Sequence, residues 1–72
     1  MPHFEIKVYP NYSDEQLDAL TKSVVDAAVR DLNVNANYVS VAIEKVNPDD
    51  WNEKVYKPLI SERAELKKAP QY

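Results

Sequence analysis

The sequence predicts an α/β fold with its elements in the order β-α-β-α, in which a parallel two-stranded unit is completed by oligomerisation. Residues 3–9 and 38–46 alternate between apolar and polar side chains, and residues 14–33 between them carry apolar side chains at helical spacing. The 72 residues include no cysteine. A chain of this size buries only about 60% of the surface that its unfolded form exposes, so small domains usually need a disulfide, a metal or a partner. We expect residues 1–72 to form one domain that assembles with copies of itself.

The first predicted strand has one apolar face. Phe4, Ile6 and Val8 point to one side, and the polar residues between them point to the other. Pro10 ends the strand, because proline has no N–H to donate to a neighbouring strand.

The predicted helix begins with a capping box, in which Ser13 is the N-cap and Gln16 follows three residues later. The helix should run to about Asn33. Its apolar stripe consists of Leu17, Leu20, Val24, Ala28 and Leu32. This stripe should cover one face of the sheet.

The second predicted strand, residues 38–46, leads to a further helix start at Asn47-Pro48. Pro58 should interrupt that helix, because proline removes a backbone hydrogen bond and clashes with the preceding turn. We therefore expect two short helical pieces, at about 48–57 and 58–67. A sheet of two strands is at best marginal alone, so the fold argues for a dimer or a larger assembly.

The charge pattern, the hydropathy and the residue counts argue against several classes of protein and site. The net charge is −3, and nine Lys and Arg are scattered among twelve Asp and Glu, so no basic stripe for nucleic acid exists. No apolar run approaches the ~18 residues of a membrane span, which predicts a soluble, cytoplasmic protein without a membrane partner. The absence of cysteine and the single histidine, His3, predict no metal site.

The opening Met1-Pro2 pair is chemically unusual. Methionine before a small residue is normally removed, which would leave Pro2 as a free secondary amine. An α-amino group titrates at about 7.7–8.0, and desolvation at the start of a buried strand would lower that value toward neutral pH. Such an amine suits general base catalysis. A terminal proline alone is also compatible with no catalytic role.

The joint register of several short motifs resembles the 4-oxalocrotonate tautomerase superfamily over essentially the whole chain, most closely its dimeric bacterial PptA-like branch. These motifs are Met1-Pro2-His3, Ile6-Lys7, Asp14-Glu15-Gln16, Arg30 with Leu32-Asn33, Pro48 with Trp51, Lys67-Lys68, Pro70 and Tyr72. The resemblance implies a tautomerase or MIF-like subunit, obligate oligomerisation and no metal or cofactor. It also implies that Pro2 is the general base and that Trp51 keeps the pocket apolar.

The sequence departs from the family at two arginines that bind a dicarboxylate, because those positions are Tyr12 and Ser40 here. Oxalocrotonate is therefore not the expected substrate. Tyr12 would donate a hydrogen bond to a carbonyl oxygen or simply pack, and Ser40 is a ligand or an ordinary strand hydroxyl.

The remaining candidates also have two interpretations. Tyr9 and Tyr38 would line the pocket or stack across an interface, and Trp51 is a pocket wall or an interface anchor. Arg30 and Arg63 are candidate cations for substrate binding, or they are ordinary solvated charges on helices. His3 should point away from the face of Pro2, which argues against a direct catalytic role.

Together these observations predict a tautomerase that interconverts keto and enol forms of a small 2-oxo acid or related carbonyl compound. We expect a homodimer or a hexamer. The alternative, from another class, is a non-catalytic oligomeric binding module that retains the tautomerase fold.

Overall fold

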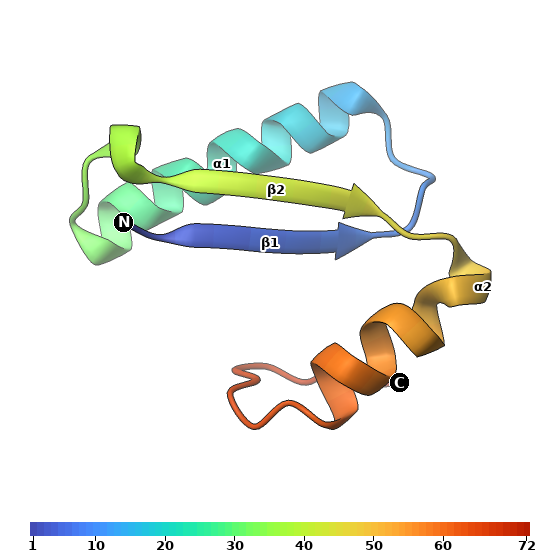
Figure 1. The fold of residues 1–72 in the computed structure, drawn as a ribbon. Helices are drawn as coiled ribbons and strands as arrows, with labels where there is room; N and C mark the ends of the chain where they lie inside the picture. Colours follow the sequence, from blue (N-terminus) through green and yellow to red (C-terminus); the bar gives the residue numbers. More distant parts are fainter.

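The computed structural model describes residues 1–72 and contains two strands and a series of helical segments (Figure 1). In chain order these are the strand β1 (His3–Val8), the helix α1 (Asp14–Leu32), the 3₁₀ turn η1 (Ala36–Tyr38), the strand β2 (Ser40–Lys45), the short helix α2 (Pro48–Trp51) and the π-helix η2 (Asn52–Ser61). The predicted order of elements is confirmed.

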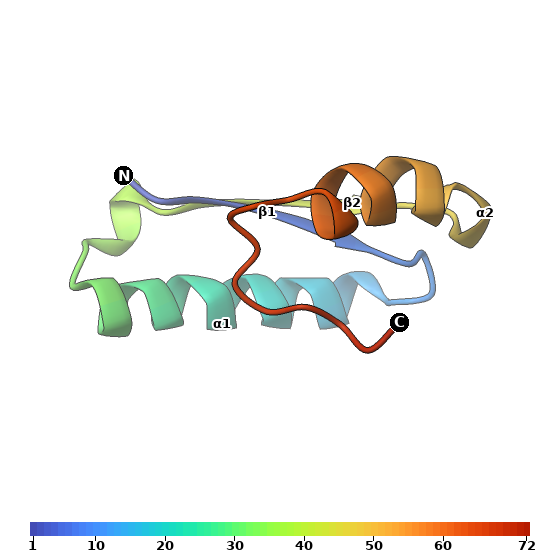
Figure 2. The same ribbon diagram turned by 90° about the horizontal axis from the view of Figure 1, so that it is seen from below.

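The two strands pair in parallel, with His3 opposite Ser40 and Val8 opposite Lys45. The helix α1 runs along one face of this sheet, and no element covers the other face (Figure 2). The segment η2 and the C-terminal tail lie on the β1 side of the sheet. The parallel β-α-β unit predicted from the sequence is therefore present, with one bare face and a free edge on β1.

The helix α1 is capped at both ends, and the N-terminal cap is the capping box that its sequence predicts. The Ser13 hydroxyl accepts from the Gln16 N–H at 3.1 Å, and the Gln16 side chain accepts from the Ser13 N–H at 2.8 Å. At the other end Asn33 adopts a left-handed conformation with φ 55°, and its N–H donates to the Val29 carbonyl. Asparagine tolerates this conformation, so it ends the helix.

The second strand begins two residues later than the alternation predicted. The side chain of Asn35 accepts a hydrogen bond from the Asn37 N–H at 2.9 Å, which holds Ala36–Tyr38 in a 3₁₀ turn. Asparagine competes with regular strand pairing through this local bond. Tyr38 therefore lies in the turn before β2 and not on the polar face of the strand.

The predicted break at Pro58 is wrong, because the helical path runs from α2 through Pro58 to Ser61 as a π-helix. A π-helix bonds each N–H to the carbonyl five residues back, so the carbonyl four residues back no longer faces the proline ring. The predicted second piece at 58–67 is also wrong, since residues 62–72 form turns and an extended tail.

The subunit buries very little apolar surface. Only Ala28, Val46 and Val55 are buried, and each keeps 3–5% of its surface exposed. Along α1, Leu20 and Val29 are each 38% exposed and Leu32 is 56% exposed. A two-stranded sheet is too narrow to cover the whole apolar stripe of this helix. No helix is long and apolar enough to cross a membrane.

Candidate functional site

The predicted site residues divide between the two ends of the sheet. Pro2, Tyr38 and Ser40 lie where the parallel strands begin, whereas Tyr9 directly follows the end of β1. At about 3.3 Å per residue, Pro2 and Tyr9 are roughly 23 Å apart. One chain therefore does not bring Pro2 together with all of its predicted partners.

An aromatic pocket of about 410 Å³ lies at the end where β1 finishes. Its lining consists of Lys7, Val8, Tyr9, Tyr12, Trp51 and Tyr72. The rings of Tyr9 and Trp51 meet edge to face, with centroids 5.0 Å apart and an interplanar angle of 86°. Aromatic pairs favour this arrangement, so the two rings form a stable apolar wall. Three predicted substrate-binding residues, Tyr9, Tyr12 and Trp51, therefore do lie together.

The C-terminal tail closes one side of this pocket. The indole N–H of Trp51 donates to the Tyr72 hydroxyl at 3.1 Å, and the Tyr72 ring lies 5.6 Å from that of Tyr56. The place of Tyr72 in the pocket was not predictable from the sequence, because no local pattern shows that residues 62–72 fold back.

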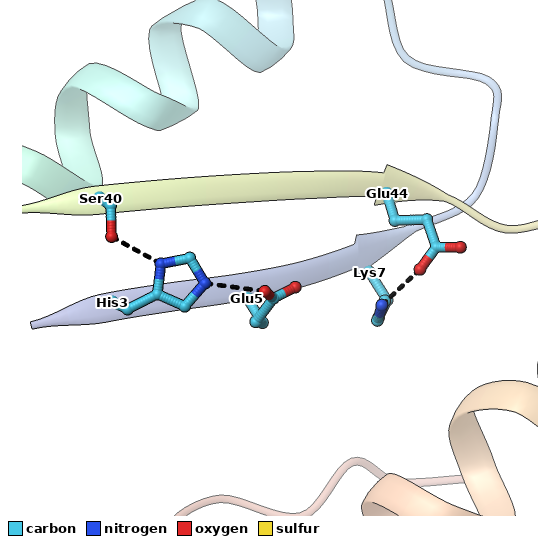
Figure 3. Close-up of polar contacts among 5 residues, drawn as sticks. All are labelled: His3, Glu5, Lys7, Ser40 and Glu44. Atoms are coloured by element: carbon cyan, nitrogen blue, oxygen red, sulfur yellow. Dashed lines mark hydrogen bonds and ion pairs between the residues drawn. The ribbon is translucent and has the colours of Figure 1, made fainter.

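Lys7 is the one charged residue that lines the aromatic pocket. Its ammonium donates to the carboxylate of Glu44 on β2, and its side chain is only 27% exposed (Figure 3). The hydrogen bond to Glu44 raises the pKa of Lys7, and the same bond lowers the pKa of Glu44. Lys7 therefore keeps a positive charge beside the aromatic wall.

A second cavity, which we call the edge cleft, has a volume of about 570 Å³ and lies between β1 and the C-terminal segment. It is lined by Glu5, Lys7, Lys54, Leu59, Arg63, Glu65, Leu66 and Lys67. Arg63 is ion-paired with Glu65 in this cleft. The other predicted cation, Arg30, lines no cavity and binds both carboxylate oxygens of Asp31 at 2.8 and 3.0 Å.

Pro2 lies at the open tip of the sheet. Its carbonyl accepts a hydrogen bond from the Ser40 N–H at 3.2 Å, and Met1 beyond it is 93% exposed. While Met1 is attached, the nitrogen of Pro2 is an amide and has no basicity. Tyr38 lies at the same end and is 62% exposed.

His3 makes contacts that the sequence analysis did not predict. Its Nδ1 lies 2.6 Å from the Ser40 hydroxyl, and its Nε2 lies 2.7 Å from Oε1 of Glu5 (Figure 3). All three side chains lie on the bare face of the sheet, as the alternation of β1 predicts for His3. The histidine thus connects a hydroxyl beside Pro2 to a carboxylate.

Residues 2–53 match the family model described as tautomerase enzyme. The Tautomerase PptA of Klebsiella pneumoniae subsp. pneumoniae is 37% identical over 100% of this chain and 97% of its own length. The Tautomerase PptA of an Enterobacter species is 36% identical with the same coverage.

Two solved structures share the fold at 24% identity. TomN, a 4-oxalocrotonate tautomerase homologue of the tomaymycin biosynthetic pathway, superposes with a TM-score of 0.68 over 69% of this chain and 77% of its own. A 4-oxalocrotonate tautomerase isozyme from Methylibium petroleiphilum gives 0.67 over 69% and 81%.

Proposed function

The chain belongs to the tautomerase enzyme family, and on that premise we propose that it is a cofactor-independent tautomerase with the free amine of Pro2 as its general base. Its substrate is a small 2-oxo acid or a related carbonyl compound. We place the protein in the cytoplasm. The observation that carries the proposal is that the family match begins at Pro2, the residue that precedes β1 at the exposed tip of the sheet.

The chemistry needs the base and an apolar pocket together. Pro2 removes the proton α to the carbonyl, so negative charge develops on the carbonyl oxygen until Pro2 returns the proton to that oxygen. An apolar wall lowers the pKa of the amine by desolvating its charged form. Tyr12 lines the aromatic pocket and carries a hydroxyl that can donate to the developing enolate. Lys7 supplies a positive charge in the same pocket.

Because Pro2 lies roughly 23 Å from its own aromatic pocket, we propose that it acts in the pocket of a second copy. The free edge of β1 is the surface that would pair. The carbonyls of Pro2 and Val8 accept from β2, so in a parallel ladder the backbone groups of alternate residues, His3, Glu5 and Lys7, point outward. These groups are available to an antiparallel β1 of the second copy.

Charge selects a register for this pairing. If Ile6 lies opposite Ile6 of the second copy, Glu5 lies opposite Lys7, and opposite charges across a strand pair are stabilising. In a register centred on Glu5, the Glu5 carboxylates of the two copies would instead lie opposite each other and repel. The Ile6-centred register also places Pro2 opposite Pro10 of the second copy, next to Tyr9 and so at the mouth of its aromatic pocket. A homodimer paired in this way contains two complete sites.

A labelling experiment tests the proposal. Protein lacking Met1 should accelerate conversion of the enol of an aryl 2-oxo acid to the keto form, and the rate should rise with pH as free Pro2 appears. An electrophile that alkylates the Pro2 nitrogen should remove the activity in proportion to the labelled fraction measured by intact mass. Protein that binds the compound without turnover would instead be the non-catalytic binding module.

A further inference from the structure

The bare face of the sheet carries a chain of three polar side chains that the mechanism above does not use. Ser40, His3 and Glu5 are linked by contacts of 2.6 and 2.7 Å, and we call them the His3 relay. They come from both strands, since His3 and Glu5 lie on β1 and Ser40 lies opposite His3 on β2 (Figure 3). The 2.7 Å contact lies at the short end of the usual range for a nitrogen–oxygen hydrogen bond, and the 2.6 Å contact is slightly shorter.

The chemistry of the three groups fixes the direction of the bonds. An ionised carboxylate only accepts, so Nε2 of His3 donates to Glu5. When the imidazole is protonated, Nδ1 also donates, and the Ser40 oxygen accepts that bond. The Ser40 hydroxyl hydrogen is then free to point outward. When the imidazole is neutral, Nδ1 accepts, and the Ser40 hydrogen points at His3.

The relay lies beside the proposed base. The Ser40 N–H donates to the carbonyl of Pro2 at 3.2 Å, which fixes the two residues as neighbours across the sheet. The Pro2 nitrogen precedes that carbonyl at the start of β1, and α1 lies along the other face of the sheet. A carbonyl compound that reaches Pro2 from the bare face would therefore approach on the side that carries the Ser40 hydroxyl.

We propose that the Ser40 hydroxyl is a catalytic hydrogen-bond donor to the enolate oxygen, and that His3 and Glu5 are positioning residues that orient its hydrogen. This inference rests on the proposed function of Pro2. The carboxylate of Glu5 stabilises the imidazolium, the imidazolium donates to Ser40, and Ser40 donates to the oxygen on which charge develops. Donors placed at that oxygen are among the largest contributions to enolate chemistry.

The surroundings of the relay are defined. On the same face the nearest charges are the Lys7–Glu44 pair, and the edge cleft places Lys54, Arg63, Glu65 and Lys67 around Glu5. The helix α1 lies on the opposite face, so its charges do not face His3.

Four variants of the Met1-free protein test the relay with the enol of an aryl 2-oxo acid. Removing one donor to a developing oxyanion typically costs about 10²-fold in kcat, so Ser40→Ala should lower kcat toward that extent with little change in KM. His3→Gln and Glu5→Gln should lower kcat by a smaller factor, again with little change in KM, because the Ser40 hydroxyl stays in place but loses the groups that orient its hydrogen. Glu62→Gln, at an exposed position outside both cavities, is the control and should keep the wild-type kcat and KM.

The outcomes separate the relay from the base. Wild-type kcat in both Ser40→Ala and His3→Gln, with Pro2 labelling still inactivating the protein, would overturn the relay alone. A processed wild-type protein with no activity would overturn the proposed function and the relay with it. Circular dichroism of each variant checks that it is folded.

Discussion

Lys7 lies where the aromatic pocket and the edge cleft meet, so its ion pair with Glu44 bears on both. The lowered pKa of Glu44 means that its contribution to stability is present above the ordinary value of 4.5 and is lost as pH falls through the lowered value. The raised pKa of Lys7 means that its contribution is present below 10.5 and is lost as pH rises through the raised value. The pair therefore stabilises the fold between these limits.

Glu44→Gln should make stability less dependent on acid pH. The urea midpoint of the wild type should decrease as pH falls below 4.5, and the variant should show a flatter decrease, because it has no carboxylate to protonate. Glu62→Gln, at an exposed position outside both cavities, is the matched control. Parallel curves for Glu44→Gln and the wild type would contradict a stabilising pair.

Trp51→Ala should lower the tautomerase rate while the assembly stays intact. Trp51 forms the apolar wall with Tyr9, so its removal admits water to the pocket. Water would solvate the protonated amine of Pro2 better. The pKa of Pro2, read from the rise of the rate with pH, should therefore increase. Sedimentation of the same sample is the control, since dissociation or unfolding would identify Trp51 as an interface or core anchor instead.

At the level of elements, local signals predicted some boundaries and missed others. The capping box of α1 lies within four residues, so sequence alone identifies it. The path of η2 through Pro58 was not predictable from the sequence. In an α-helix the proline ring would clash with the carbonyl four residues back, and a π-helix avoids that clash. Tyr38 fits the alternation of apolar and polar residues along β2. It nevertheless lies in a turn, because the Asn35 side chain accepts a hydrogen bond from the Asn37 N–H and holds residues 36–38 there.

The candidate site was predictable in its residue types and not in their arrangement. Tyr9, Tyr12 and Trp51 do line one pocket, whereas the strand length separates them from Pro2. Tyr72 reaches the same pocket through a tail whose path depends on tertiary contacts.

Ser13→Ala should destabilise the protein by about 1 kcal/mol, because it removes the side-chain oxygen that accepts from the Gln16 N–H. Ser23→Ala, at an exposed position inside α1, is the matched control and should change stability by no more than a few tenths of a kcal/mol. Urea unfolding at one fixed protein concentration measures both. Equal midpoints for the two variants would show that the cap contributes nothing.

For the whole molecule, the exposed apolar surface points to assembly. A groove of about 350 Å³ between β1 and α1 is lined mainly by apolar side chains. Its residues are Phe4, Val24, Ala27, Ala28, Asp31 and Leu32. Together with the free edge of β1, this groove gives a second copy both backbone and side-chain surface to contact.

Mixing an inactivated protein with an impaired one should restore activity if the site is shared between copies. One protein is alkylated at Pro2 and the other is Trp51→Ala. A mixed dimer holds one site with an intact Pro2 facing an intact pocket, so random exchange should recover up to about a quarter of the wild-type rate. No gain above the sum of the separate rates, with exchange verified by native mass spectrometry, would place the whole site within one chain.

The central claim is that the nitrogen of Pro2 is the base, and Met1 controls whether that base exists. The most direct measurement compares the tautomerase rate of the Met1-free protein with that of protein that retains Met1, at equal concentration and with the processing state verified by intact mass. Loss of a positioned base typically costs about 10²–10⁴-fold, so the retained form should be slower by that factor. A retained form as active as the processed one would contradict the mechanism, because an amide nitrogen takes up no proton.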